Sequence, residues 1–389
     1  MKRPHTVSSV IRIELLVAVS SLSMFLMGFS DALKGSVVGE MVSTAGLDYS
    51  FGGLIIGTSY FGFFAGTLAT FFLLPVIRVA LLLEISLGVI GLGALSFGIS
   101  SSTFQILFSA FLVGLGCGLV DVTANLAVKV ADTHGKVGKA LVRLAFYHGV
   151  GAIVAPLFAL AIITYFHHWQ AVYRVAFFVL LAAVILSIFG IQKSGCFDKR
   201  IGSRGSTFMF NKKLVLLAFL LFWYMTIEAG LSGWIVTYAL FVSPEKHSLA
   251  HGLLSAFFIL LTCGRLVSSN YVDSLGLEKS IILGGAGALI SLTISLVFPS
   301  LNVLLPLVGL FLSFLFPTTV ALISNELGDA GLHTMGIFFS ISGIGGLVGP
   351  YFVGLLASAV SLTAGMWLLV AFGICFLLFI VRYARLRGR

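Results

Sequence analysis

Residues 149–156 read GVGAIVAP and residues 343–350 read GIGGLVGP, so a glycine and a proline stand at the same spacing in both stretches. A second likeness joins residues 30–35 (SDALKG) to residues 227–233 (IEAGLSG), because each has an acidic residue shortly before a glycine. All four stretches lie inside long apolar runs. Motifs that recur at matching places in two parts of a chain indicate an internal duplication. We therefore expect two related halves.

The composition is that of a membrane protein. Of 389 residues, 59% are hydrophobic and only 10% are charged, whereas about a quarter of the residues in soluble domains are charged. The 36 Phe and 44 Gly residues suit a helical bundle with bulky side chains toward lipid and small residues where helices touch. The sequence predicts an all-α protein in a lipid bilayer, and its first apolar segment is too long for a cleaved signal peptide.

Apolar runs of about 20 residues, the length of a helix that spans a bilayer, occur twelve times. The loops between these runs are short, with one exception described below. The expected transmembrane helices cover residues 11–38, 48–73, 76–99, 103–130, 138–165, 169–192, 213–241, 249–273, 279–298, 301–324, 331–358 and 361–384.

The exception is a polar, basic stretch, KSGCFDKRIGSRGSTFMFNK, at residues 193–212. Six expected helices precede it and six follow it. We therefore expect an N-terminal six-helix bundle over residues 1–192, a cytoplasmic linker loop over residues 193–212, and a C-terminal six-helix bundle over residues 213–389. The repeated motifs predict that the two bundles are related by pseudo-symmetry.

The 23 Lys and Arg residues are distributed unevenly between the two ends of the expected helices. Most of them fall on one side of the bilayer, which includes both tails and the linker. Because basic loops favour the cytoplasmic side, we expect a multi-pass protein of the inner cell membrane with both termini in the cytoplasm. This distribution also accounts for the net charge of +9, and we expect no nucleic-acid partner.

One motif connects the chain to a known family. Residues 264–280 read GRLVSSNYVDSLGLEKS, which resembles the cytoplasmic motif that major facilitator superfamily members carry between their eighth and ninth helices. The corresponding copy between the second and third helices keeps little beyond Arg78. The resemblance covers the whole chain and implies the major facilitator fold, with two six-helix bundles and alternating access. It also implies that Arg265 and Asp273 act in gating.

Within that superfamily, several stretches are similar to the fucose–galactose–proton symporters and related glucose transporters. They are GFSDALKG at 28–35, GLGCGLVDVTANLAV at 114–128, LAFYHGVGAIVAPL at 144–157 and IEAGLSGWIVTY at 227–238. This likeness implies a sugar or a sugar-like compound as the solute, and a proton or a sodium ion as its partner.

Ionisable residues inside membrane helices are rare and often functional. Asp31 has Lys34 three residues later on the same helix face, so a permanent intrahelical ion pair is the alternative to a coupling role. Asp121 and Arg143 are expected at similar depth on successive helices, where they can pair. An acid that moves between such a partner and an unpaired buried state binds and releases a proton. We take Asp121, Asp31, Glu228 and Arg143 as candidates for proton coupling, with a static Asp121–Arg143 pair as the alternative.

Glu228 is expected near the middle of the bilayer, with Trp234 and Tyr238 later on the same helix. A carboxylate can accept hydrogen bonds from hydroxyl groups, while aromatic rings cover the apolar faces of a sugar. The alternative is a protonated Glu228 that bonds a neighbouring helix. The candidate substrate-binding residues are Glu228, Asn125, Trp234, Tyr238, His148 and Tyr147.

The sequence contains no phosphate-binding loop, nucleophile motif or zinc-site spacing, so we expect no enzymatic activity, no cofactor and no metal site. We expect a monomeric secondary active transporter that moves a small polar solute by symport with protons or sodium. Three alternatives stay open. They are a proton-coupled efflux antiporter for drug-like compounds, a flippase for an amphipathic lipid, and a sensor or scaffold that does not transport.

Overall fold

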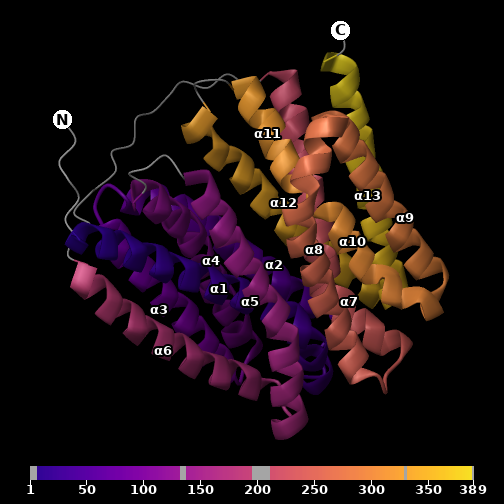
Figure 1. Ribbon diagram of the computed structural model, residues 1–389. Coiled ribbons are helices and arrows are strands. Elements are labelled where there is room, and N and C mark those ends of the chain that lie inside the picture. The colour runs from indigo at the N-terminus through magenta and orange to yellow at the C-terminus, as the bar shows by residue number, and fades with distance from the viewer. Residues whose placement is uncertain (1–6, 132–136, 195–210, 328–330, 388–389) are drawn as a thin grey trace.

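The computed structural model describes residues 7–131, 137–194, 211–327 and 331–387, which form helices joined by short turns (Figure 1). Within these ranges, 12 helical segments are long and apolar enough to cross a membrane. The first six spans are α1 (Val7–Thr44), α2 (Tyr49–Leu73), α3 (Val79–Gly98), α4 (Thr103–Ala131), α5 (Val137–Phe166) and α6 (Gln170–Ser194). The last six are α7 (Lys212–Val242), α8 (His247–Leu275), α9 (Leu277–Val297), a tenth span made of η1 (Pro299–Leu304), α10 (Leu305–Leu312) and α11 (Leu315–Leu327), then α12 (Gly331–Ala359) and α13 (Leu362–Arg387).

The predicted all-α membrane fold is confirmed, and most helix ends lie within a few residues of the expected ones. The first helix differs most, because it continues to Thr44 instead of ending near residue 38. Most of the linker expected over residues 193–212 lies outside the described residues.

The tenth span was expected as one continuous helix but is broken at residues 313–314. Pro317 has no backbone N–H, so the carbonyl group of Ser313 cannot receive its usual helical hydrogen bond. The Ser313 hydroxyl group instead donates to the Leu310 carbonyl oxygen at 2.6 Å and satisfies part of the last turn of α10. The missing N–H of Pro317 is therefore the local contribution of the sequence to the break.

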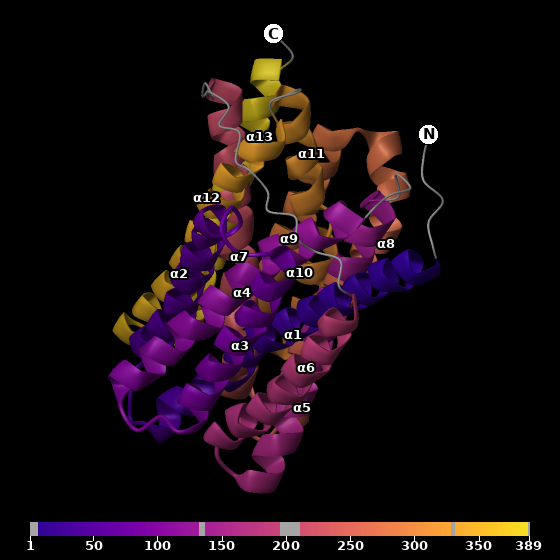
Figure 2. The same cartoon turned by 90° about the vertical axis from the view of Figure 1, so that its left-hand side faces the viewer.

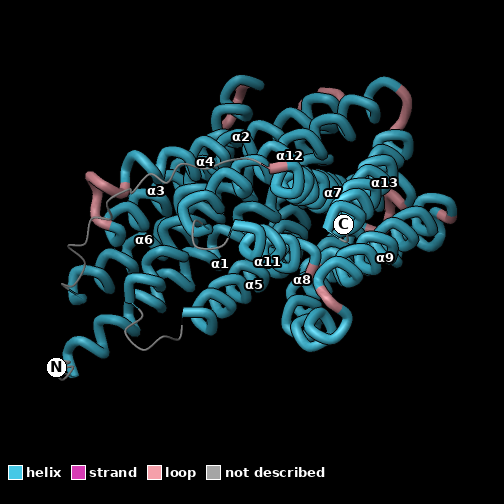
Figure 3. Tube along the Cα trace, turned by 90° about the horizontal axis from the view of Figure 1, so that it is seen from above, coloured by secondary structure: helices cyan, strands magenta, loops and turns pink. Residues whose placement is uncertain are grey.

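The first six and the last six spans form two groups in space (Figures 1 and 2). In the first group α4 packs against α2 and α3, whereas α1 packs against α5; in the second, α7 packs against α12 and α13. The groups meet where α2 lies along α12, α5 beside α8 and α1 beside α7 (Figure 3).

Close contact between the two groups depends on glycine at two places. Gly35 on α1 faces the carbonyl oxygen of Ser232 on α7, and Gly53 on α2 faces that of Pro350 on α12. A Cβ atom at either glycine would overlap the backbone oxygen, so any larger residue would push the groups apart. The acidic-glycine stretches that resemble each other in sequence therefore touch in the fold.

The two groups are joined more firmly away from the chain ends. We call the end where α1 begins and α13 finishes the terminal end, and the other the opposite end. At the opposite end the Ser50 N–H donates to the Ser358 hydroxyl oxygen at 2.7 Å. About halfway along, the Ser255 hydroxyl group donates to the Ile153 carbonyl oxygen at 2.9 Å. Toward the terminal end the two groups of ribbons diverge (Figure 1).

Candidate functional site

A cavity of about 360 Å³ lies between the two groups of spans, within the size range of small-molecule sites. Side chains reach it from α1, α2, α4 and α5 on one side and from α7, α8, α11 and α12 on the other. We call it the central cavity. Its polar lining consists of Asp31, Tyr60, Asp121, Asn125, His148, Tyr224, Glu228, Arg265 and Ser342, and its large apolar side chains are Met24, Met27, Phe63, Met225, Phe316, Pro317 and Phe339.

Asp31 is held in an ion pair at the wall of this cavity. The Lys34 ammonium nitrogen lies 2.6 Å from the Asp31 carboxylate and 2.8 Å from the Ser59 hydroxyl oxygen. It also lies 4.7 Å from the centre of the Tyr60 ring. Lys34 is only 4% exposed, and a buried ammonium group needs such partners to offset its lost hydration. The intrahelical pair considered from the sequence is therefore present, and it also ties α1 to α2.

Asp121 has an amide neighbour, and no basic residue that the structure describes forms an ion pair with it. The Asn125 side-chain amide donates to the Asp121 carbonyl oxygen at 2.7 Å and to its carboxylate at 3.2 Å. Arg143 is exposed, with its guanidinium group 5.9 Å from the centre of the Tyr147 ring.

The described structure contains no ion pair between Asp121 and Arg143, so the predicted pair is wrong for this conformation. The reason lies in the packing, because α4 packs mainly against α2 and α3 whereas α5 packs mainly against α1 and α8. The consecutive helices α4 and α5 are therefore not close neighbours along most of their length.

Glu228 faces the central cavity from α7, one turn after Tyr224. The Arg265 guanidinium group donates to the Tyr224 hydroxyl oxygen at 3.5 Å, and its charge also acts on Glu228. The sequence has no base one turn away from Glu228 on its own helix, and the structure brings one from another helix. The arginine comes from α8, so spacing along α7 could not reveal it.

Arg265 also contacts the break in the tenth span. Its Nε group donates to the Ser313 carbonyl oxygen at 3.3 Å, which is the oxygen that Pro317 leaves without a helical donor. Gly264 lies against the same serine, because a Cβ atom there would overlap the Ser313 side chain. The Gly-Arg start of the cytoplasmic motif thus stabilises a broken helix beside the cavity. The predicted gating partner Asp273 is on α8, but its side chain lies outside those described.

Of the substrate candidates other than Glu228, Asn125 and His148 line the central cavity and three do not. Trp234 is fully buried, and its ring N–H donates to the Pro350 carbonyl oxygen at 3.0 Å. Tyr238 is also fully buried, and Tyr147 lies beneath the Arg143 side chain. Positions three, four or seven residues after Glu228 would share its helix face, and Trp234 and Tyr238 hold none of them.

Sequence reasoning did not select Ser342, Phe316 or the three methionines of the cavity. Uncharged side chains of this kind are common in every span, so nothing in the pattern separates them from lipid-facing or packing residues. A proline in the middle of a span was the one available signal, because it marks where the backbone of the tenth span breaks. Among the described side chains, His, Cys, Asp and Glu form no cluster of three that could hold a metal ion.

Comparisons with known proteins relate the chain to a family. Residues 20–331 match the model of the Major Facilitator Superfamily. A relative, "Membrane protein MosC" of Rhizobium meliloti, is 26% identical over 280 residues, which cover 69% of this chain and 65% of that protein. The chain therefore matches just under two thirds of the length of this relative.

Solved structures share the fold over nearly the whole chain. A bacterial homologue of the human lysosomal transporter Spinster aligns with a TM-score of 0.80 and 13% identity, covering 95% of this chain and 96% of that one. The nucleoside transporter NupG aligns at 0.73 and 10%, covering 95% and 99%. The peptide transporter POT aligns at 0.76 and 12%, covering 95% of each chain. At these identities the likeness concerns the fold. Because the family model covers most of its length, the chain belongs to the Major Facilitator Superfamily and is a membrane transporter of that type.

Proposed function

We propose that this transporter moves a small polar solute, a sugar or a sugar-like compound, together with protons by alternating access. The observation that carries the proposal is that Asp121 and Glu228, from opposite groups of spans, face one small cavity. Carboxylate and amide groups accept hydrogen bonds from hydroxyl groups, and the rings of Tyr60 and Tyr224 offer faces for the apolar side of a sugar. The likeness of residues 114–128 and 227–238 to sugar symporters supports the same solute class.

Asp121 is the proposed proton site. It lines the central cavity from within a span, and Asn125 is its hydrogen-bond donor. A carboxyl group that passes between buried and hydrated surroundings exchanges a proton, and alternating access creates such a change. Asp31 is less suited, because Lys34 already balances its charge. Glu228 is proposed to bind the solute, with Asn125 and His148 as further contacts.

The observed conformation fits the state open to the cytoplasm. The two groups are joined at the opposite end and diverge toward the terminal end (Figure 1). With both termini cytoplasmic, as the basic loops predict, the diverging side faces the cell interior. We propose that Arg265 and Asp273 help to close this side when the transporter turns outward. We also propose that the two moving units are an N-terminal bundle over 1–192 and a C-terminal bundle over 213–389.

An efflux antiporter for drug-like compounds is the second candidate. It is favoured by the apolar part of the cavity wall, where three methionines accompany Phe63, Phe316 and Phe339. Flexible methionine side chains adapt to ligands of different shapes. A sodium-coupled symporter and a lipid flippase share the same fold, so the direction of transport, the solute and the ion must be measured together.

The test is transport by the purified protein in lipid vesicles. Labelled fucose, galactose and glucose are offered with an inward proton gradient, an inward sodium gradient or neither, beside a labelled drug-like cation. Accumulation of a sugar that follows the proton gradient supports the proposal. Sugar accumulation that follows only the sodium gradient would show that sodium, and not the proton, is the coupling ion. Cation movement against the proton gradient, with no sugar uptake, would establish the antiporter instead.

A further inference from the structure

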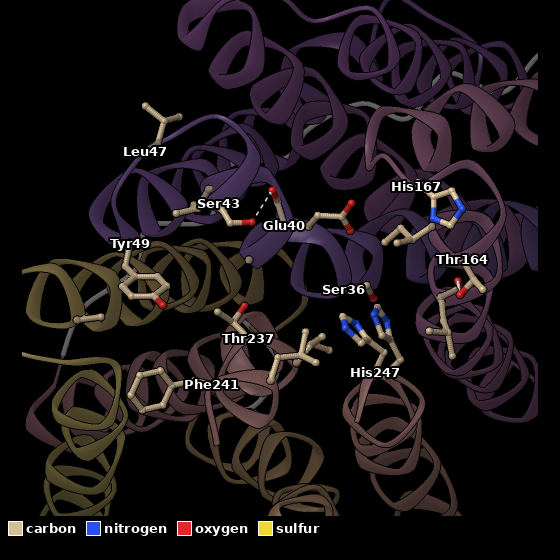
Figure 4. A pocket seen from close by; sticks show the side chains of 18 of the residues that line it. Ser36, Glu40, Ser43, Leu47, Tyr49, Thr164, His167, Thr237, Phe241 and His247 are labelled. Carbon is tan, nitrogen blue, oxygen red and sulfur yellow. Dashed lines mark hydrogen bonds between the residues drawn. The ribbon is translucent and has the colours of Figure 1, made fainter. Parts of the chain in front are cut away.

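A second and larger cavity, of about 1130 Å³, lies at the opposite end of the bundle (Figure 4). Its wall is built from the ends of α1, α5, α7 and α12 and the beginnings of α2 and α8. It shares no lining residue with the central cavity among the side chains that the structure describes. We call it the outer vestibule, and the proposed function leaves it without a role.

The charged lining of the outer vestibule is acidic. Glu40 and Asp48 are its two acids, its titratable bases are three histidines, and neither Lys nor Arg lines the described part of its wall. The Glu40 carboxyl group has no hydrogen bond or ion pair with any described residue, although His247 lies across the cavity from it (Figure 4). A carboxylate in this setting attracts a cation.

Two residues of the same wall hold a buried polar group without a partner. His251 is 3% exposed and Thr237 is 7% exposed, and neither the His251 Nδ1 atom nor the Thr237 hydroxyl group has a hydrogen-bond partner. The His251 ring also lies against the Pro156 carbonyl oxygen. A proton on the ring nitrogen that faces this carbonyl leaves Nδ1 as an acceptor. Because a buried acceptor without a donor is costly, the vestibule is short of hydrogen-bond donors.

We propose that the outer vestibule binds a small primary amine with an apolar body. An ammonium group carries three N–H donors and a positive charge, which match the carboxylate of Glu40 and the free acceptors of His251 and Thr237. The apolar part of the ligand packs against Leu160 and Phe241, which belong to the same wall. An aromatic ring near the cation adds a favourable interaction.

Binding at this place affects the transport cycle. The acid Glu40 belongs to the first group of spans, whereas Thr237 and His251 belong to the second. An amine that contacts all three holds the two groups together at the end where they are already joined. It therefore stabilises the observed conformation and inhibits transport without competing for the central cavity.

The experiment measures binding to the purified full chain with a matched pair of probes, 2-phenylethylamine and the uncharged 2-phenylethanol. The amine is expected to bind at least tenfold more tightly than the alcohol, and Glu40→Gln should remove this preference. Thr237→Val should weaken amine binding several-fold and provides a second variant if Glu40→Gln does not fold. Glu245→Gln, which removes an exposed acid at the same end but outside the vestibule, should change nothing.

Two results would overturn the assignment. Equal binding of the amine and the alcohol would show that the vestibule does not select a cation. Loss of the preference in Glu228→Gln or Asp121→Asn, with Glu40→Gln behaving like the unchanged protein, would place the amine in the central cavity. Neither result depends on the transported solute, so failure of this inference and failure of the proposed symport are distinguishable.

Discussion

Proton coupling through Asp121 is tested most directly by Asp121→Asn. The substitution exchanges a carboxyl group for an amide of nearly the same shape, and an oxygen can remain at the position 3.2 Å from the Asn125 amide. It breaks no ion pair, because none joins Asp121 to a described basic residue. We expect a folded protein whose stability changes by no more than about 1 kcal/mol, the ordinary contribution of one hydrogen bond.

The defect of Asp121→Asn should appear in the accumulation of solute against its gradient. A gradient of one pH unit supplies about 1.4 kcal/mol for each proton, which supports roughly tenfold accumulation if one proton moves with one solute. The unchanged protein should approach this ratio in vesicles that are acidic outside. Asp121→Asn should equilibrate the solute at a ratio of about 1, because the proton-binding step is gone and the cavity keeps its shape.

The assay pairs two measurements on the same vesicles, namely accumulation under a pH gradient and exchange of labelled for unlabelled solute without one. Asp121→Asn should lose the first and keep the second. Arg143→Gln is the matched control, since Arg143 contacts Tyr147 rather than Asp121, and it should keep both. Full accumulation by Asp121→Asn would refute the coupling role. Lost accumulation in Arg143→Gln would show that the two residues pair in another conformation.

Three further outcomes follow from the described contacts. Glu228→Gln should weaken solute binding by roughly tenfold or more, because a hydrogen bond to a charged group contributes about 1.5–3 kcal/mol; equilibrium binding measures this. Gly53→Val should destabilise the observed conformation, since its side chain meets the Pro350 carbonyl group, and cysteine accessibility at the opposite end should rise. Asp48 caps α2 and accepts hydrogen bonds from the Ser50 hydroxyl group and the Phe51 N–H, which lower the pKa of Asp48. Asp48→Ala should cost about 1 kcal/mol, seen as a lower Tm at pH 7, and the difference should shrink below about pH 4, where the unfolded-state carboxyl group protonates first.

The helices were readable from the sequence because a bilayer imposes a length and an apolar character on each span. The break in the tenth span is the exception. Pro317 was visible, but whether a proline bends or breaks a helix depends on what satisfies the released carbonyl group. Here the Nε group of Arg265 donates to the released Ser313 carbonyl oxygen, and Arg265 belongs to another helix. The break was therefore a tertiary property that no single segment could disclose.

The candidate site was partly predictable from the sequence because the bilayer makes the spans apolar. Asp31, Asp121 and Glu228 stood out because charges are rare in apolar runs, and all three line the central cavity. Their partners were less accessible to sequence reasoning. The Asp31–Lys34 pair lies within one helix and follows from spacing. The effect of the Arg265 charge on Glu228 and the separation of Asp121 from Arg143 depend instead on which helices become neighbours. In this fold α4 packs mainly against α2 and α3, and α5 mainly against α1 and α8.

The place of Lys34 limits which acid can carry the proton. Asp31 lines the central cavity, and Ser36, two residues after Lys34, lines the outer vestibule, so the ion pair lies in the wall between the two spaces. Protonating Asp31 would leave a buried ammonium group beside a neutral partner, and breaking one member of a buried pair costs about 3–5 kcal/mol. One pH unit supplies about 1.4 kcal/mol, which is too little to offset that cost. The pair is therefore expected to persist through the cycle, and the proton is expected to bind an acid without a fixed cation. Of the three acids that line the central cavity, Asp31 is paired with Lys34 and Glu228 lies in the field of Arg265, which leaves Asp121.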